Sequence, residues 1–443
     1  MSSAFPLEKG KAEISSQSFA VSEKAEGING QTQRSEHYAF LEEQDKDKDV
    51  ARQAGEALQT AHLNAAPKQV FQEIGGFSVD LDEQEAEQLR QVPCIKSCEA
   101  DQPLELTDPI ESEEAEGFVQ PATAVEAPGE GQTAFNGRVI DGSQQQVESS
   151  QEIATDALTS YGDSTASSGE ILPYGVKAVW GGQDVSTKGN AGEGCYAFVI
   201  DSGVLATTGD LLVNKAWSRS WVNGESAFTD GNGHGTHVAG TIAALANNRG
   251  VVGVAPGAEV ISLKIFDSFG GGASYSKVID AVNYATSVIN QNELDKNKCV
   301  INMSLGGGFS SGLDQAVRNA ANQGIKFSIA AGNAGSDADF WSPASAGDHP
   351  NVYTVSAVDN QYRMASWSNW DDPNGGDDVD VAAPGVRVLS YHQGGNLRYL
   401  SGTSMAAPHV AGLLLMGNGK LTEGDRVQAN ASGHSDPFAL VAA

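Results

Sequence analysis

The sequence predicts an α/β domain with a mostly parallel central sheet, preceded by a small α+β domain. Three observations predict the larger domain. Six short apolar runs recur after residue 170: "YAFVID", "EVISLKIFD", "CVINMSLGG", "KFSIAAGN", "VYTVSAVD" and "VRVLSY". Helical patterns such as "HVAGTIAALAN" and "SKVIDAVNYATSVI" lie between them, as is typical of a parallel sheet covered on both faces. Several runs end in a polar residue, where ligands of such sheets bind: Asp201, Asp267, Ser304, Asn333 and Asp359.

Four segments follow one another along the chain. Residues 1–35 are polar and are expected to be disordered. Residues 36–106 form the small α+β domain. Residues 107–169 hold twelve acidic residues and one basic residue, Arg138. Such a segment cannot bury enough apolar surface to offset its ordering entropy, so we interpret it as an acidic disordered linker. Residues 170–443 form the α/β domain.

The elements of the small domain can be assigned in order. "HYAFL" predicts a first strand, and Val50, Ala54 and Leu58 recur at the spacing of a helix. "FSVDLD" alternates apolar and polar residues as a strand does. "DEQEAEQLRQV" predicts a second helix that begins with acidic residues, and "CIKSCEADQPLEL" predicts the last strand. About 70 residues suffice for one such domain.

Composition excludes several classes of partner. The chain has 443 residues, of which 57 are acidic and 27 basic, for a net charge of -30. This excess argues against nucleic acid and anionic membranes as partners. No window approaches the roughly 20 apolar residues of a membrane helix, and residues 1–40 contain no apolar run typical of a signal peptide. We expect a monomer with no nucleic-acid or membrane partner. Its compartment stays open, and extracellular location without a conventional signal peptide is one alternative.

The four cysteines do not predict a disulfide framework. Cys94 and Cys98 lie four residues apart in an expected strand, which separates them by roughly 13 Å, beyond disulfide reach. Cys195 and Cys299 both precede apolar runs and could lie at the same end of a sheet. A pair between them stays open, although a buried free thiol is the commoner state.

Three segments each place a reactive side chain beside glycines. "FVIDSGV" ends a strand with Asp201, "GNGHGTHVAG" opens a helix with His234, and "SGTSMAAPHVAG" opens another with Ser404. Taken singly, each has an ordinary structural interpretation as a turn cap, a loop residue or a helix cap. Together they supply the members of a Ser-His-Asp hydrolase. Composition alone does not separate His234 from His237, because both lie in the first turn of one helix.

These segments, in the chain order Asp, His, Ser, resemble those of the subtilisin-like serine proteases, the subtilases. The resemblance covers roughly residues 170–410, and "FWSPAS" and "SLGGGFSSG" are similar to the proteinase K branch. It implies a three-layer subtilisin-like fold and a serine endopeptidase that cleaves extended polypeptides through an acyl-enzyme. It also implies that His234 is the base, that His237 and His409 are structural, and that the Asn333 amide joins the Ser404 N–H in an oxyanion hole.

The resemblance implies further site residues. Substrate would bind as an added strand at "SLGG", Ser304, Leu305, Gly306 and Gly307, with Tyr275 on the opposing edge and Trp341 near the main pocket.

Structural calcium, a hard cation, is implied at two sites. The first would use the side chains of Asp210, Asn247 and Glu170 and the carbonyls of Leu245, Arg249 and Val251. The second would use Asp380 and the carbonyls of Pro350 and Val352.

The unit at residues 36–106 resembles the inhibitor I9-type propeptide of these proteases. The resemblance implies an autoprocessed zymogen whose own propeptide is an intramolecular inhibitor. The linker separates the two domains by about 60 residues, so the cut could fall near Leu106, near Ser168, or at both.

Two other functions stay open. A non-catalytic binding or chaperone-like module could use the same fold, but the presence of all four catalytic residue types argues against it. An esterase could use the same triad, although the strand-adding "SLGG" edge favours peptides.

Overall fold

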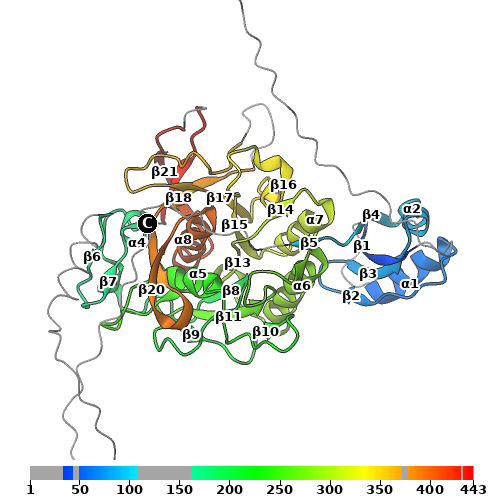
Figure 1. Cartoon of the computed structure of the whole chain (residues 1–443), viewed down its shortest axis with the longest axis horizontal. Helices are drawn as coiled ribbons and strands as arrows, with labels where there is room; N and C mark the ends of the chain where they lie inside the picture. Colours follow the sequence, from blue (N-terminus) through cyan, green and yellow to red (C-terminus); the bar gives the residue numbers. More distant parts are fainter. Residues whose placement is uncertain are drawn as a thin grey trace, which may run out of the picture.

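The computed structural model describes residues 33–42, 49–104, 106, 161–371, 378–430 and 433–442. These form a small domain that ends at residue 106 and a larger domain that begins at residue 161 (Figure 1). Most of the expected N-terminal segment and the expected linker as far as residue 160 lie outside the described residues. Within the described part of the chain, no helix is long and apolar enough to cross a membrane.

The larger domain is built on a ten-stranded sheet with the order β10-β11-β8-β13-β15-β17-β18-β22-β21, with β9 beside β11. The strands are parallel from β10 to β22, and β21 is antiparallel to β22. The predicted mostly parallel α/β sheet is therefore confirmed. The strands are β8 (Tyr196–Asp201), β9 (Leu212–Val213), β10 (Arg219–Ser220), β11 (Glu259–Lys264), β13 (Cys299–Met303), β15 (Lys326–Ala330), β17 (Val352–Val358), β18 (Val381–Pro384), β21 (Leu421–Arg426) and β22 (Pro437–Val441).

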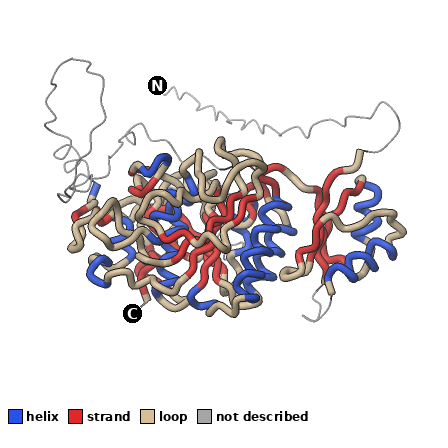
Figure 2. Tube along the Cα trace, turned by 90° about the horizontal axis from the view of Figure 1, so that it is seen from below, coloured by secondary structure: helices blue, strands red, loops and turns tan. Residues whose placement is uncertain are grey.

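Helices cover both faces of this sheet, which makes three layers (Figure 2). One face packs against α4 (Tyr174–Val179), α5 (His234–Ala243) and α8 (Thr403–Met416), and the other against α6 (Tyr275–Gln291) and α7 (Ser311–Ala321). Strand β8 shows why both faces are apolar: Ala197 and Val199 belong to the first core, and Phe198 and Ile200 to the second. This arrangement leaves the carboxyl edge of the sheet as the place where loops meet.

The small domain is an antiparallel sheet with two helices and its own core, as predicted. Its strand order is β2-β3-β1-β4. The second helix begins with a capping box between Asp82 and Glu85, which explains the acidic start seen in the sequence. The elements are β1 (Ser35–Leu41), α1 (Val50–Thr60), β2 (Gln69–Phe71), β3 (Gly76–Leu81), α2 (Glu83–Arg90), β4 (Ile95–Ala100) and a tail strand, β5 (Pro103–Leu104).

The segment at residues 161–169, which the sequence assigns to the linker, is part of the larger domain. Strand β6 (Ser164–Thr165) pairs with β7 (Ile171–Leu172). The buried carboxylate of Asp163 accepts hydrogen bonds from the Tyr174 N–H and the Tyr399 hydroxyl, each at 2.6 Å. Burial raises the pKa of Asp163 to about 6. Hydrogen bonds to one carboxylate hold this segment, which has few apolar residues. An apolar pattern therefore could not reveal that it belongs to the larger domain.

All four cysteines lie in described segments and are free. Cys98, Cys195 and Cys299 are buried, and the expectation of free thiols is confirmed.

Candidate active site

The predicted acid and base meet at the carboxyl edge of the sheet. Asp201 ends β8, and His234 is the first residue of α5. The distance from His234 Nδ1 to Asp201 is 2.9 Å for Oδ1 and 3.0 Å for Oδ2, and both side chains are buried. A carboxylate on Nδ1 keeps the proton there, which makes Nε2 the basic nitrogen.

Two residues that the sequence analysis missed fix this pair. The Asp230 carboxylate accepts hydrogen bonds from the Gly233 N–H (2.7 Å), the Thr236 N–H (2.8 Å) and the Ser202 hydroxyl (2.9 Å). The Ser202 hydroxyl in turn accepts from the Gly235 N–H at 3.0 Å. The turn after Asp201 is thereby tied to the first turn of α5. A carboxylate shortly before a helix start is a capping signal, so Asp230 could have been found from "DGNGHGT".

Ser404 lies in the first turn of α8, against the end of β13. Its hydroxyl donates to the Ser304 carbonyl at 3.3 Å, and the Ser304 hydroxyl donates to the Ser404 carbonyl at 2.8 Å. The second bond has a local cause. In a regular helix the Ser404 carbonyl would accept from residue 408, but Pro408 has no N–H. The Ser304 hydroxyl supplies the missing donor and fixes the turn that carries the nucleophile candidate.

Asn333 follows β15 and is held by the residue before Ser404. Its Oδ1 accepts from the Thr403 N–H at 2.9 Å and from the Thr403 hydroxyl at 2.8 Å. Because two donors fix the amide oxygen, the Nδ2 group points the other way and serves as a donor. Asn333 and Ser404 line the same cavity, and the N-terminal turn of a helix also leaves N–H groups without intrahelical partners.

That cavity has a volume of about 210 Å³ and an uncharged lining. Ala330, Ala331 and Ala344 contribute methyl groups, and Trp341 contributes its indole, whose N–H donates to the Ser336 hydroxyl at 2.9 Å. Such a cavity suits a large apolar side chain.

The predicted substrate edges lie beside this cavity. Leu305 and Gly306 line it, while Gly307 belongs to β14 (Gly307–Gly308), which pairs with β16 (Trp341–Ser342). Tyr275 is buried, and its hydroxyl donates to the Gly308 carbonyl at 2.7 Å, which joins the two edges.

The tail of the small domain lies between these edges. Strand β5 pairs antiparallel with β12 (Ala273–Ser274), and the Leu106 N–H donates to the Gly270 carbonyl at 2.9 Å. The side chain of Leu104 lies over Gly307, where a Cβ would be only 2.8 Å from Leu104 Cδ1. The described tail is therefore an added strand on the Tyr275 side, and Leu104 packs over Gly307 of the predicted "SLGG" edge across from it.

Two carboxylates of the small domain cap helices of the larger one. Glu99 accepts from the Ser310 hydroxyl (2.9 Å), the Gly312 N–H (3.1 Å) and the Ser311 hydroxyl at the start of α7. Asp101 accepts from the Ser276 N–H (2.8 Å) and hydroxyl (2.6 Å) at the start of α6. Negative charge at a helix N-terminus is favourable. These contacts join segments far apart in the chain, so no local pattern predicted them.

Amide side chains hold the opposite end of the interface. Asn319 of α7 donates to the Ile74 carbonyl at 2.7 Å, and Gln323, just after α7, donates to the Glu73 carbonyl at 2.6 Å. Asn283 of α6 accepts from the Glu73 N–H at 2.9 Å. The β2–β3 turn is thus hydrogen-bonded to uncharged side chains of the larger domain.

The first predicted calcium set contains an unsatisfied oxygen. Asp210 is fully buried and accepts from Asn247 Nδ2 at 2.7 Å and from the Tyr391 hydroxyl at 2.6 Å. Asn247 Oδ1 is buried and has no hydrogen-bond partner within the described part of the chain. Glu170 is also buried and accepts from the Asn248 N–H at 2.8 Å. A buried carboxylate beside an orphaned amide oxygen fits a hard cation. Tyr391 was not foreseen.

The second predicted set fits less well. Asp380 Oδ2 accepts from the Thr354 N–H at 2.8 Å. Several buried side-chain atoms of the described residues lack a hydrogen-bond partner, but the Asp380 oxygens are not among them. The same residues contain no group of three His, Cys, Asp or Glu side chains that could hold a metal. At either predicted calcium site, amide and carbonyl oxygens would therefore have to supply many of the ligands.

The other histidines of these helices make structural contacts. His237 Nε2 lies 3.0 Å from the Val388 carbonyl, and burial lowers its pKa well below the usual value. His409 Nδ1 lies 2.9 Å from the Met405 carbonyl, and burial lowers its pKa to about 4. Neither makes the contact that His234 makes with Asp201.

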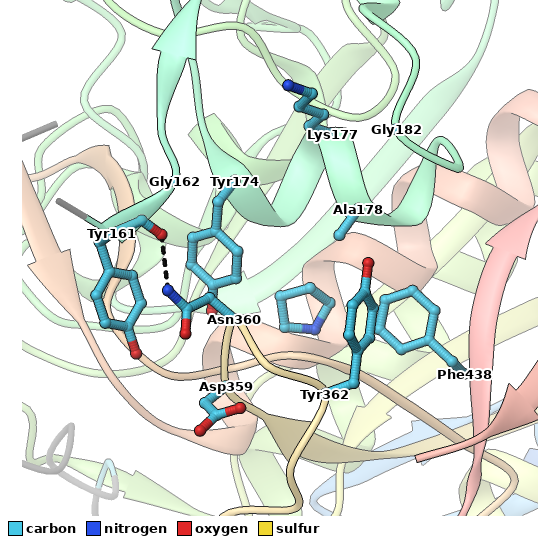
Figure 3. A pocket seen from close by; sticks show the side chains of 11 residues that line it. Tyr161, Gly162, Tyr174, Lys177, Ala178, Gly182, Asp359, Asn360, Tyr362 and Phe438 are labelled. Atoms are coloured by element: carbon cyan, nitrogen blue, oxygen red, sulfur yellow. Dashed lines mark hydrogen bonds between the residues drawn. The ribbon is translucent and has the colours of Figure 1, made fainter. Parts of the chain in front are cut away.

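A second cavity, of about 240 Å³, lies between the Tyr161–Gly162 segment, α4, residues 359–362 and β22 (Figure 3). Asn360 donates to the Tyr161 carbonyl at 2.9 Å, and the rings of Tyr362 and Phe438 pack edge to face. None of the predicted site residues lines it, whereas Asn333 and Ser404 line the smaller cavity.

Comparison with known proteins identifies the family of each domain. The subtilase family model matches residues 192–421, and the peptidase inhibitor I9 model matches residues 18–107. Subtilisin DY of Bacillus licheniformis is 42% identical over 244 residues, which cover 55% of this chain and 83% of that protein. Subtilisin E of Bacillus subtilis is 40% identical over 245 residues, 55% of this chain and 60% of the relative.

A longer relative and a relative of known structure are also similar to this chain. Subtilisin-like protease 5 of Arthroderma otae is 40% identical over 233 residues, and the match spans 53% of this chain but only 55% of the relative. The crystal structure of a cold adapted subtilisin-like serine proteinase shares 31% identity at a TM-score of 0.49, and the match covers 61% of this chain and 98% of the solved one. The chain belongs to the subtilase family of serine endopeptidases and carries a peptidase inhibitor I9 domain ahead of its subtilase domain.

Proposed function

We propose that this chain hydrolyses peptide bonds in extended polypeptides, with Ser404 as nucleophile, His234 as general base and Asp201 as the group that orients the base. The observation that carries the proposal is the buried contact of His234 Nδ1 with both oxygens of Asp201, 2.9 and 3.0 Å away. It provides a base of fixed tautomer at the sheet edge where α8 presents a serine.

The reaction follows from these roles. Ser404 Oγ attacks the substrate carbonyl carbon while its proton passes to His234 Nε2, and Asp201 stabilises the imidazolium. The oxyanion accepts hydrogen bonds from Asn333 Nδ2 and the Ser404 N–H. His234 then protonates the leaving amine, which gives an acyl-enzyme. Water, activated by the same imidazole, releases the acid and restores Ser404.

The uncharged cavity of about 210 Å³ supports a preference for a large apolar side chain before the scissile bond. A charged side chain would lose its hydration there without gaining a partner.

Covalent labelling tests the assignment against the alternatives. A sulfonyl fluoride should modify Ser404 of the processed protein, as located by mass spectrometry, and should stop hydrolysis. Failure to label would favour a non-catalytic module. Hydrolysis of esters without any hydrolysis of the matching peptides would favour an esterase.

Replacing Asn333 with alanine is expected to lower kcat about 10²–10³-fold with little change in KM, the range found for the corresponding loss in subtilisin. The physical reason is that the amide donates to charge that develops only in the transition state. Steady-state kinetics on a peptide substrate measure the effect. Thr403→Val, which removes one of the two donors to Asn333 Oδ1, should give a smaller loss. A change in KM alone would contradict the role.

We propose that the small domain, at residues 36–106, inhibits the enzyme until it is removed and that the cut falls upstream of residue 161. The tail pairing with β12 supports the first point, because it occupies the substrate edge. The second is supported by the Ser167 N–H, which donates to Asp184, and by Asp163, which accepts from the Tyr399 hydroxyl; both bonds, at 2.6 Å each, hold the segment against the domain. Of the two cuts considered from the sequence, the one near Leu106 is therefore favoured over the one near Ser168.

Combining Glu99→Gln with Asp101→Asn is expected to weaken inhibition at least about 100-fold, because charge-assisted hydrogen bonds are worth about 1.5–3 kcal/mol each. The measurement is the recovery of activity on dilution after processing. Glu87→Gln, on the exposed face of α2, is the matched control and should leave inhibition unchanged. Equal inhibition by the double variant and the wild type would show that the helix caps contribute nothing.

We propose that Asp210, Asn247 and Glu170, with the carbonyls of Leu245, Arg249 and Val251, hold a structural calcium ion. The orphaned Asn247 Oδ1 supports this set. Asp380 with the carbonyls of Pro350 and Val352 stays a second, less supported site. Calcium would stabilise the fold and take no part in the chemistry.

Chelating calcium is expected to lower the melting temperature of the wild type by about 6–12 °C, since saturation with ligand is worth roughly 3 kcal/mol and each kcal/mol shifts a domain of this size by about 2–4 °C. Asp210→Asn should melt lower in calcium and should not respond to chelation. Asp380→Asn is the comparison for the second site. A full calcium response in Asp210→Asn would place the ion elsewhere.

We also propose that the processed enzyme is a monomer that acts outside the cell. Sedimentation of the purified protein tests the first point, and recovery of the processed chain from culture medium tests the second.

A further inference from the structure

Five large hydrophobic side chains are exposed among the described residues, and three of them are phenylalanines. The exposed fractions are 94% for Phe269, 67% for Phe340 and 61% for Phe309, against 46% for Tyr362 and 42% for Leu212. We propose that Phe269, Phe309 and Phe340 form an apolar rim that binds hydrophobic side chains of unfolded polypeptide substrates beyond the segment held in the cleft. The inference rests on the proposed endopeptidase function and adds the class of substrate.

Phe309 and Phe340 flank one strand pair beside the cleft. In the antiparallel pair of β14 and β16, Gly308 faces Trp341. Phe309 directly follows Gly308, and Phe340, the last residue of the 3-10 helix Ala338–Phe340, directly precedes Trp341, so both residues lie at the same end of this strand pair. Trp341 also lines the cavity that contains Ser404. The pair therefore lies one residue beyond the strands that build the proposed specificity pocket.

The third ring lies beside the path of the tail. Phe269 directly precedes Gly270, whose carbonyl accepts the hydrogen bond from the Leu106 N–H at 2.9 Å. Its own N–H donates to Asp267 Oδ1 at 2.8 Å, which fixes the loop below the ring. The tail thus runs between the Phe269 loop and the Gly307 edge over which Leu104 packs.

The docked small domain does not cover these rings. Leu104 and Leu106 of the tail are buried in the cleft, whereas the three phenylalanines keep the exposed fractions given above with the domain in place. A partner that covers them must reach outside the path of the described tail. Exposed aromatic rings contiguous with a binding site are typical of an extended recognition surface.

Charge indicates what that partner is. Residues 268–276 and 304–313, which form the two edges, contain no charged residue, although 19% of the chain is charged and the net charge is -30. Carboxylates neighbour the rings of Phe269 and Phe340 in the chain, at Asp267 and at Asp337 and Asp339. The rings themselves gain most by burying apolar side chains. Such side chains are accessible in unfolded chains and hidden in folded ones.

The test compares kcat/KM for three substrates of the processed enzyme. One is a tetrapeptide 4-nitroanilide ending in Phe, which fills only the cleft. The others are longer peptides with one common scissile sequence, flanked either by Phe and Leu or by Ser. The variant carries F269S, F309S and F340S. L212S, at the amino edge of the sheet beside Glu259, is the matched control.

For the triple variant, kcat/KM on the apolar-flanked peptide is expected to fall about tenfold or more, because each buried ring contributes apolar area. Values for the other two substrates should change less than about twofold, and L212S should resemble the wild type on all three. An equal fall on all three substrates, or no fall on the apolar-flanked one, would overturn the rim. Failure of the wild type to cleave the tetrapeptide would instead overturn the proposed function.

A binding measurement keeps the inference testable without turnover. The full-length Ser404→Ala chain should bind a fluorescent, reduced and carboxymethylated polypeptide about tenfold more tightly than the same chain with the three serine replacements. Equal affinities would contradict the proposal. So would a dimer of the full-length chain that the replacements dissociate, because the rim would then bind a second copy.

Discussion

Replacing Ser404 with alanine is expected to abolish peptide hydrolysis and to leave the small domain attached. Alanine cannot form the acyl-enzyme, and loss of the nucleophile in subtilisin costs about 10⁶-fold in kcat. Self-cleavage needs the same hydroxyl, so the purified chain should keep its original N-terminus. Intact mass and hydrolysis of a peptide nitroanilide measure the two losses.

The control for this experiment is Ser401→Ala. Ser401 lies three residues earlier, and its hydroxyl accepts from the Arg387 N–H at 2.9 Å, so its loss removes a structural hydrogen bond only. That variant should be processed and active. Purified Ser404→Ala protein that is cut at the wild-type position in a host lacking other proteases would refute the assignment. Circular dichroism of both variants establishes that they are folded.

Replacing Asp201 with asparagine is expected to lower kcat about 10⁴-fold while the fold is kept. The amide nitrogen would donate to His234 Nδ1 and drive the proton onto Nε2, so the imidazole could no longer accept the proton of Ser404. The two short contacts between Asp201 and Nδ1 make this effect larger than that of any other single carboxylate described here. Stopped-assay kinetics over a long time course can resolve so low a rate.

Asp230→Asn provides the comparison for Asp201→Asn. Asp230 ties the same turn to α5 through Gly233 and Thr236 but does not touch the imidazole. Its loss should act mainly through stability, by about 1–3 kcal/mol for buried hydrogen bonds. A kcat of Asp201→Asn within about tenfold of the wild-type value would contradict the proposed role of Asp201.

The sequence predicted what is local and periodic. Apolar runs such as "YAFVID" predicted the parallel sheet because strands buried on two faces must be apolar throughout. Asp201, His234 and Ser404 could be chosen because each sits in a short glycine-flanked segment at the end of a strand or the start of a helix. The resemblance of these segments to one family then gave their order and roles.

What the sequence did not predict depends on contacts between distant segments. The bond from Ser304 to the Ser404 carbonyl exists because Pro408 lacks an N–H, and nothing near Ser304 in the chain reveals it. The pairing of the tail with β12 joins Leu104 to Ala273, which lie far apart in the chain. The boundary at residue 161 escaped notice because a buried carboxylate, and not an apolar run, anchors that segment.

Because both ends of the linker are anchored, cutting it changes how inhibition depends on protein concentration. The tail is held at β12, and Asp163 holds the other end to Tyr399, which precedes the Ser404 helix. While residues 107–160 are intact, inhibitor and enzyme share one molecule, so the effective concentration of the inhibitor is fixed by the tether and is independent of how much protein is present. One cut in that segment makes inhibition bimolecular. From then on, simple dilution activates the enzyme, with no change in any contact described here.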